Sequence, residues 1–136
     1  MSQFFDTNIL VYAQQTGGKA ERARALLAAG GVLSVQVLDE FAAVARRKLA
    51  KDGDEIDAAI GDVLALVEAP RPLTLDTNAT ARALARARGF SFYDALIVAA
   101  AIEAGCETLA SEDMQAGRTI GALTIVNPFL DLAPPP

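Results

Sequence analysis

Residues 3–10 read Gln3-Phe4-Phe5-Asp6-Thr7-Asn8-Ile9-Leu10, and they give the clearest indication of the fold class. A short apolar strand over 3–6 is expected to run directly into a helix over 8–15, with one acid at the junction. Short strands alternate with helices along the rest of the sequence as well. Such alternation predicts an α/β domain with a mainly parallel central sheet that is covered by helices on both faces.

The remaining elements are expected from apolar periodicity and from breaks at glycine and proline. Predicted helices cover 19–29, 36–51, about 54–68, 77–88 with Asp76 as its cap, and 91–104. Further strands are expected at 32–35, 73–75, 108–110 and 123–126, and a short helical turn is expected around Met114. We expect a single domain over residues 1–130 and a flexible, proline-rich tail over 131–136.

Composition favours a cytoplasmic protein without a membrane span. The chain has 136 residues, which fits one domain with an ordinary core. Its longest apolar run, Ala95–Ile102, is far shorter than the roughly 20 residues that cross a bilayer. No basic region precedes an apolar stretch at the N-terminus, as a signal peptide requires. The single cysteine, Cys106, cannot form an internal disulfide, which favours a reducing compartment.

The chain contains no histidine, and this narrows its possible chemistry. A Ser-His-Asp triad, a cysteine–histidine pair and any histidine-ligated zinc site are all excluded. General base catalysis then falls to a carboxylate or to a metal-activated water. The net charge of -5 argues against broad binding of nucleic-acid backbones, which needs many lysines and arginines.

Four acids stand where strands are expected to meet helices: Asp6, Glu40, Asp94 and Asp113. The carboxyl ends of parallel strands share one edge of a sheet, where ligands bind in folds of this class. At ~5 Å, two such carboxylates repel each other by roughly 3 kcal/mol if the effective dielectric constant is about 20. A hard divalent cation with oxygen ligands relieves that repulsion, so the four acids indicate a metal site.

Each acid also has a purely structural interpretation. Asp6 or its neighbour Asn8 can cap the first helix. Asp94 can complete a capping box that begins at Ser91, and Asp113 can favour a helix N-terminus that Ser111 caps. Glu40 is different, because it lies inside a helix among apolar neighbours and has no capping role.

The order of these motifs resembles PIN-domain ribonucleases of the kind found as VapC toxins in type II toxin–antitoxin systems. The matching segments are Phe5-Asp6-Thr7-Asn8-Ile9-Leu10, Ser34-Val35-Gln36-Val37-Leu38 followed by Glu40-Phe41, Ser91-Phe92-Tyr93-Asp94-Ala95-Leu96, Leu109-Ala110-Ser111-Glu112-Asp113-Met114, and Asn127-Pro128-Phe129. The resemblance runs from about residue 3 to residue 129 and implies a PIN-like, three-layer α/β/α fold.

The resemblance also implies an activity and a set of partners. It implies that the four acids bind one or two Mg²⁺ or Mn²⁺ ions and that a metal-activated water hydrolyses RNA, leaving a 5′-phosphate and a 3′-hydroxyl. Thr7, Asn8 and Ser111 would hold the carboxylates, and Glu112 would either help them or share the role of Asp113. The implied partners are an RNA substrate, a cognate antitoxin and a second copy of the chain in a homodimer.

The basic residues and the competing functions are less sharply defined by sequence. Arg118 follows the Asp113 turn and is the best single candidate for a contact to RNA. One rival function is a non-catalytic PIN scaffold that binds RNA or protein. Another is a Mg²⁺-dependent phosphohydrolase or receiver domain, although such proteins need a late lysine and the lysines here are Lys19, Lys48 and Lys51.

Overall fold

The computed structural model describes residues 2–132 and contains one four-stranded sheet. Its strands are β1 (Gln3–Phe5), β2 (Thr108–Ala110), β3 (Thr119–Ile120) and β4 (Leu123–Val126). They lie in the order β1-β2-β4-β3, and only the β3–β4 pair is antiparallel. Phe4 pairs with Leu109, which pairs with Ile125, and all three are fully buried. The mainly parallel sheet is therefore the centre of the core.

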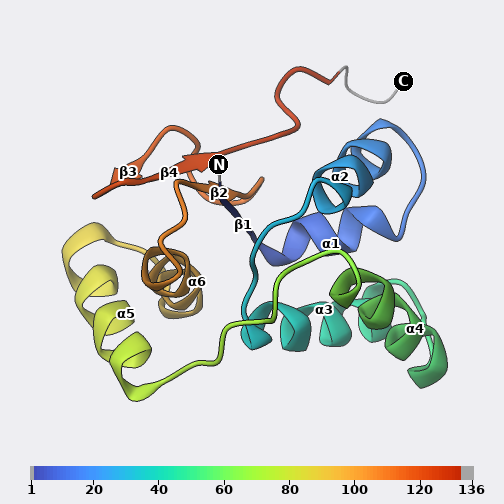
Figure 1. Cartoon of the computed structure of the whole chain (residues 1–136), viewed down its shortest axis with the longest axis horizontal. Helices are drawn as coiled ribbons and strands as arrows, with labels where there is room; N and C mark the ends of the chain where they lie inside the picture. Colours follow the sequence, from blue (N-terminus) through green and yellow to red (C-terminus); the bar gives the residue numbers. More distant parts are fainter. Residues whose placement is uncertain (1, 133–136) are drawn as a thin grey trace.

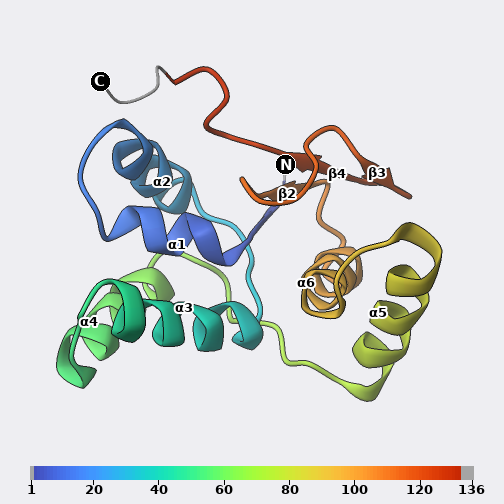
Figure 2. The same ribbon diagram turned by 180° about the vertical axis from the view of Figure 1, so that it is seen from behind.

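Six helices cover this sheet in two groups (Figures 1 and 2). They are α1 (Thr7–Ala13), α2 (Gly18–Ala28), α3 (Val35–Lys48), α4 (Gly53–Leu64), α5 (Leu75–Arg88) and α6 (Phe92–Glu103). Helices α1–α4 lie together on one side of the strands, and α5 and α6 pack against each other on the other side. The arrangement confirms the predicted three-layer α/β/α fold.

Helix α6 explains the most apolar run in the sequence. Every residue from Ala95 to Ala101 in this helix is buried, so it is covered on all sides by the rest of the domain. A helix that is apolar all round is typical of a core helix. No helix in the described part of the chain has the length and apolarity needed to cross a membrane.

Two predicted strands are wrong. Residues 32–35 form only single parallel bridges, in which Val32 pairs with Phe4 and Ser34 pairs with Arg71, and α3 already begins at Val35. Residues 73–75 are not a strand, because Thr74 caps α5 with a capping box and Leu75 is its first helical residue. Asp76 consequently lies in the first turn of α5 and is not its cap.

The segment after β2 also differs from its prediction. Residues around Met114 form bends, not a helical turn, so no helix N-terminus is available to Asp113. The short strand β3 was not predicted. It pairs with β4 through a two-residue hairpin turn, Gly121-Ala122, in which Gly121 has a φ of 59°. A strand of two residues is too short to show the alternation of apolar and polar residues by which strands are predicted.

The end of the described chain lies against α2. Arg22 donates two hydrogen bonds to the carboxylate of Asp131, at 2.9 and 3.0 Å, and a third to the Pro128 carbonyl at 2.6 Å. The predicted flexible tail begins at residue 131, and its residues 133–136 lie outside the described part of the chain.

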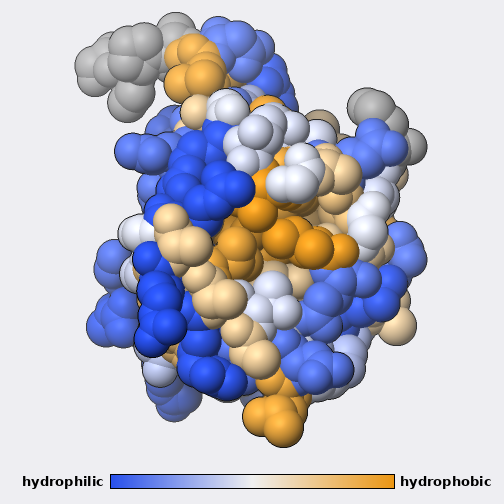
Figure 3. Space-filling view, turned by 90° about the vertical axis from the view of Figure 1, so that its left-hand side faces the viewer, coloured by the Kyte–Doolittle hydropathy of each residue, from blue (hydrophilic) through white to orange (hydrophobic). Residues whose placement is uncertain are grey.

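The side of the molecule that carries α5 and β3 has an apolar strip across its middle, with strongly hydrophilic residues beside it (Figure 3). Ile102 of α6 is 37% exposed and lines a shallow hollow of about 210 Å³ together with Ile120 and Leu123. Exposed apolar strips with polar borders are typical of surfaces that contact other proteins.

Candidate functional site

Asp6 stands directly after β1, where the chain turns into α1. Its backbone N–H donates to the Ala110 carbonyl at 3.0 Å, so the residue is still fixed to the end of β2. Its side chain is 5% exposed and accepts hydrogen bonds from the Thr7 N–H at 2.7 Å and the Ser111 hydroxyl at 2.6 Å. Asp6 therefore caps α1 and also lies at the carboxyl ends of two neighbouring strands.

Glu40 is held from two sides by neutral donors. The Thr7 hydroxyl donates to one carboxylate oxygen at 2.7 Å, and the Gln36 amide donates to the other at 3.0 Å. Gln36 is 5% exposed and also donates to the Tyr93 carbonyl at 3.0 Å. The sequence did not single out Gln36 as a site residue. Its only signal was its place one turn before Glu40 on the same face of α3.

Asn8 joins Asp6 to Asp113. Its side-chain amide lies 3.4 Å from an oxygen of Asp6 and 3.2 Å from an oxygen of Asp113. Its amide oxygen accepts the backbone N–H of Glu112 at 3.4 Å. Through these contacts α1 positions the exposed segment that follows β2 and carries Asp113.

Asp94 lies in the first turn of α6. Its backbone N–H donates to the Ser91 hydroxyl at 3.3 Å, which confirms Ser91 as the helix cap. The return half of a capping box, from the Ser91 N–H to the Asp94 carboxylate, is not formed. The carboxylate is half-buried and faces the other acids. The pKa of Asp94 is raised by burial and by repulsion from Glu40 and Asp113, while the Ser91 hydroxyl lowers it.

The pKa of Asp6 is raised to about 6 by burial and, to a smaller extent, by repulsion from Asp94 and Asp113, despite the hydrogen bonds from Ser111 and Thr7 that lower it. These repulsions show that the acids share one environment. Within residues 2–132 the ion pairs are Lys19–Glu112 and Arg22–Asp131. None of the four site acids is therefore paired with a basic side chain in the described part of the chain.

The donor set fits a hard divalent cation by type, because every candidate ligand is a carboxylate oxygen. As the side chains lie, no three acidic groups between residues 2 and 132 are close enough to one another to hold an ion. The hydrogen bonds from Thr7, Asn8 and Gln36 keep Glu40 and Asp113 in place around Asp6. Asp6 and Asp113 thus lie beyond the carboxyl ends of β1 and β2, and Glu40 of α3 and Asp94 of α6 lie near them in an open arrangement.

Glu112 belongs to a different cluster from Asp113. Its carboxylate accepts a hydrogen bond from Tyr12 and lies 2.6 Å from the Lys19 ammonium. Partial burial opposes ionisation, but the hydrogen bonds from Lys19 and Tyr12 hold the pKa of Glu112 below its usual value. Its side chain connects the segment after β2 to α1 and α2.

Arg118 lies beside the acids. It lines an open hollow of about 350 Å³ together with Asp94 and Asp113. Its guanidinium stacks over the ring of Phe90 at 4.1 Å and donates to the Arg88 carbonyl at 2.9 Å.

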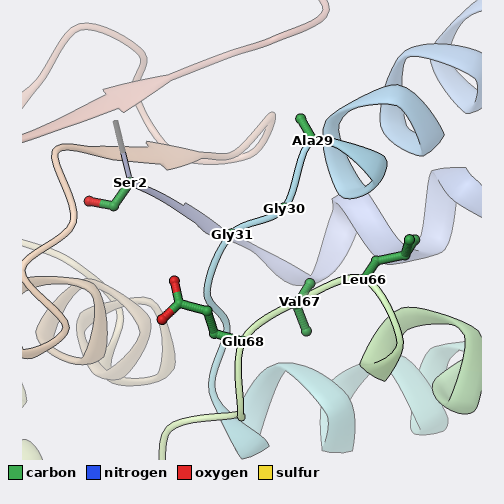
Figure 4. Close-up of a pocket in the computed structure, with 7 residues that line it drawn as sticks. All are labelled: Ser2, Ala29, Gly30, Gly31, Leu66, Val67 and Glu68. Carbon is green, nitrogen blue, oxygen red and sulfur yellow. The ribbon is translucent and has the colours of Figure 1, made fainter.

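A second hollow, of about 560 Å³, lies at the opposite end of β1 (Figure 4). Ser2, Gly30 and Gly31 line it from the strand side, and Leu66 and Glu68 line it from the segment after α4. Its one ionisable side chain is Glu68, which is exposed. The four acids are therefore not part of this hollow.

Three solved structures share the fold at low sequence identity. VapC20 of Mycobacterium tuberculosis, a sarcin–ricin loop cleaving toxin, matches with a TM-score of 0.65 and 23% identity over 82% of this chain and 90% of that chain. A toxin–antitoxin complex from Klebsiella pneumoniae matches with a TM-score of 0.71 and 21% identity over 93% of this chain and 98% of that chain. VapBC2 of Rickettsia felis, bound to promoter DNA, matches with a TM-score of 0.67 and 22% identity over 92% of this chain and 97% of that chain.

Comparison of the sequence with curated proteins gave no match. The family model of the PIN domain matches residues 4–119, which include all four acids, the last two residues of β1 and the whole of β2. The chain therefore belongs to the PIN-domain family.

Proposed function

We propose that this chain is a Mg²⁺- or Mn²⁺-dependent endoribonuclease and the toxin of a toxin–antitoxin pair. The observation that supports this proposal most strongly is the grouping of four acids that have no basic partners in residues 2–132: Asp6 and Asp113 follow β1 and β2, and Glu40 and Asp94 on α3 and α6 lie close enough to add to the repulsion. Such an arrangement is costly for a protein that binds no cation. One of the similar structures is a toxin that cleaves the sarcin–ricin loop, which agrees with an RNA substrate.

The proposed roles follow from the contacts of each residue. Asp6 and Asp94 are the most direct ligands, since the side chain of each is buried or half-buried and burial raises its pKa. Glu40 and Asp113 complete the set. One or two bound ions would supply an activated water and stabilise charge on the phosphate and the leaving oxygen.

The neutral polar residues orient these acids. Thr7 and Ser111 each donate a short hydrogen bond to a carboxylate, and Asn8 joins two of them. Glu112 holds the segment that carries Asp113, and Arg118 contacts the RNA. Such supporting contacts fix the orientation of metal ligands in other proteins.

We further propose a cognate antitoxin, a homodimer and a cytoplasmic location. Two of the similar structures, from Klebsiella pneumoniae and Rickettsia felis, are described as a toxin–antitoxin complex and as VapBC2 on promoter DNA. The apolar strip beside α5 and β3 supports a protein–protein contact on this chain (Figure 3).

Expression of the wild-type chain alone in bacteria tests this function. We expect growth to stop and to resume in cells that make Asp6→Asn or Asp94→Asn protein at the same level. A variant at the exposed neighbour of Glu40, Asp39→Asn, serves as a control and should remain toxic. Equal toxicity of the wild type, Asp6→Asn and Asp94→Asn would contradict a metal-dependent mechanism, and a harmless wild type would favour a non-catalytic PIN scaffold.

A further inference from the structure

The hollow of about 350 Å³ beside the acids combines chemical features that the metal ligands do not explain. Asp94 and Asp113 line it on the side of the candidate site, and Arg118, Ser91 and Gln115 line the rest. Its volume is at the lower end of the roughly 300–1,000 Å³ typical of small-ligand sites. The hollow is thus large enough for one nucleotide next to the site.

Arg118 is held flat in this hollow. Its guanidinium carbon lies 4.1 Å from the centre of the Phe90 ring, and one of its N–H groups donates to the Arg88 carbonyl at 2.9 Å. Phe90 itself is only 9% exposed, so the guanidinium covers the ring. One face of the guanidinium is therefore occupied by Phe90, and because Arg118 is partly exposed, a ligand can approach its other face.

We propose that this hollow binds the nucleotide next to the scissile phosphate and that the base of this nucleotide stacks on the free face of the Arg118 guanidinium. Unpaired RNA bases stack on aromatic rings and on guanidinium planes in proteins. A phosphate would need only the charge of Arg118, whereas the Phe90 platform fixes the plane of the group and so favours a flat partner. Ser91 and Gln115, both exposed at the rim, can hydrogen-bond the edge of the base.

The inference rests on the proposed ribonuclease function and adds a recognition element to it. A stacked base gives a preference for unpaired RNA, because a base within a duplex cannot reach the guanidinium. Two arginines, Arg88 and Arg118, and two of the site acids, Asp94 and Asp113, line the hollow.

A cycle that combines one protein change with one RNA change tests the proposal. The RNA probes are oligonucleotides that span the cleavage position mapped for the wild-type protein, each lacking the base at one nucleotide. Binding is measured with Asp6→Asn protein, which we expect not to cleave the RNA. The hollow should be unchanged in this protein, because Asp6 does not line it. The second protein carries Arg118→Lys together with Asp6→Asn. This change keeps the positive charge but removes the planar guanidinium. Arg82→Lys on α5, an exposed arginine outside the hollow, is the matched control.

We expect removal of the base at one position beside the cut to weaken binding about tenfold when Arg118 is present. The same removal should have no effect in the Arg118→Lys protein, whose overall affinity should already be about tenfold lower with an unchanged dependence on salt. Arg118→Gln should change the slope of log affinity against log salt by much less than the roughly 0.7 that is lost with one phosphate contact, because a guanidinium that stacks on a base neutralises no phosphate.

Two results overturn the inference. If the Arg118→Lys protein binds like the Arg82→Lys control, or if the effects of Arg118→Lys and of base removal simply add at every position, Arg118 is a charge contact and no base stacks on it. Failure of the wild-type protein to cleave any RNA would overturn the proposed function together with this inference, whereas cleavage without coupling overturns the inference alone.

Discussion

The side-chain amide nitrogen of Gln36 lies 3.0 Å from a carboxylate oxygen of Glu40, one turn later on α3. The same nitrogen donates to the Tyr93 carbonyl in the first turn of α6, also at 3.0 Å. Both neighbours are acceptors, so only the nitrogen of the amide can face them. The amide oxygen is buried and has no partner among the described residues. Gln36 therefore links the helix that carries Glu40 to the helix that carries Asp94.

Replacement of Gln36 by methionine should reduce turnover more than RNA binding. Methionine fills a similar volume but cannot hold Glu40 or the Tyr93 carbonyl, so the two acids lose their fixed relation. We expect kcat to fall by about 10–100-fold with little change in KM. Steady-state cleavage kinetics check this, and the neighbouring Asp39→Asn should behave as wild type. A change confined to KM would show that Gln36 acts on RNA binding and not on Glu40.

Asp6→Asn should stabilise the metal-free protein at neutral pH. The pKa of Asp6 is about 6 in the folded chain, against ~3.9 in an unfolded chain. Between these pH values the folded state binds more protons, so stability falls as pH rises from about 4 to 6. The shift corresponds to about 3 kcal/mol at pH 7, which sets the upper limit of the gain. Asparagine keeps an oxygen to accept the Thr7 N–H.

Thermal unfolding in chelator from pH 4 to 7 measures this effect as the difference between wild type and Asp6→Asn. The difference should be near zero at pH 4 and grow toward pH 7, and Mg²⁺ or Mn²⁺ should reduce it by stabilising the wild type only. A wild type that is the more stable protein at pH 7 in chelator would show that burial of the Asp6 charge is fully compensated by its hydrogen bonds.

Glu112→Gln and Asp113→Asn should separate the roles of these two adjacent acids. Glu112 is engaged by Lys19 and Tyr12, whereas Asp113 contacts Asn8 beside Asp6. We expect Asp113→Asn to slow RNA cleavage by about 10²-fold and Glu112→Gln by less than about threefold. Single-turnover cleavage rates decide between them. The reverse order would assign the ligand role to Glu112.

Gly31→Ala should destabilise the domain, because the added Cβ would lie 2.6 Å from the Phe5 ring and 2.8 Å from the Gln3 carbonyl oxygen. We expect a loss of about 1–3 kcal/mol in the free energy of unfolding. Gly61→Ala in α4 is the matched control, since its Cβ meets nothing within 4 Å, and it should add about 0.5–1 kcal/mol. Urea unfolding of both variants measures the difference, and equal stabilities would show that β1 moves to accommodate the added methyl group.

Much of the fold could be predicted because its signals are local. The strand over 3–5, the cap at Ser91 and the core helix that follows are all evident from apolar runs and capping residues. The segments 32–35 and 73–75 could not be assigned in this way. Residues 32–34 are buried without forming a ladder, and the segment 73–75 continues into a helix. Local sequence does not contain the pairing partner that distinguishes a strand from an extended segment.

The candidate site shows the same limit. Asp6 and Asp113 could be singled out by their places after strands, and Glu40 by its lack of a capping role. Gln36 could not, because its importance depends on contacts to Glu40 and to the Tyr93 carbonyl, 57 residues away. The separation of Glu112 from Asp113 likewise depends on Lys19 and Tyr12, which approach only in the folded chain.

Metal-dependent cleavage of RNA by the purified protein tests the central claim most directly. The measurement is the rate of cleavage, with mapping of the fragment ends, in Mg²⁺, in Mn²⁺ and in EDTA, for wild type and Asp94→Asn. We predict fragments with 5′-phosphate and 3′-hydroxyl ends that form with either ion, disappear in EDTA and are at least about 10²-fold slower to form with Asp94→Asn. Cleavage at the same rate in EDTA, or in the Asp94→Asn protein, would contradict the assignment of these acids to a metal-dependent ribonuclease.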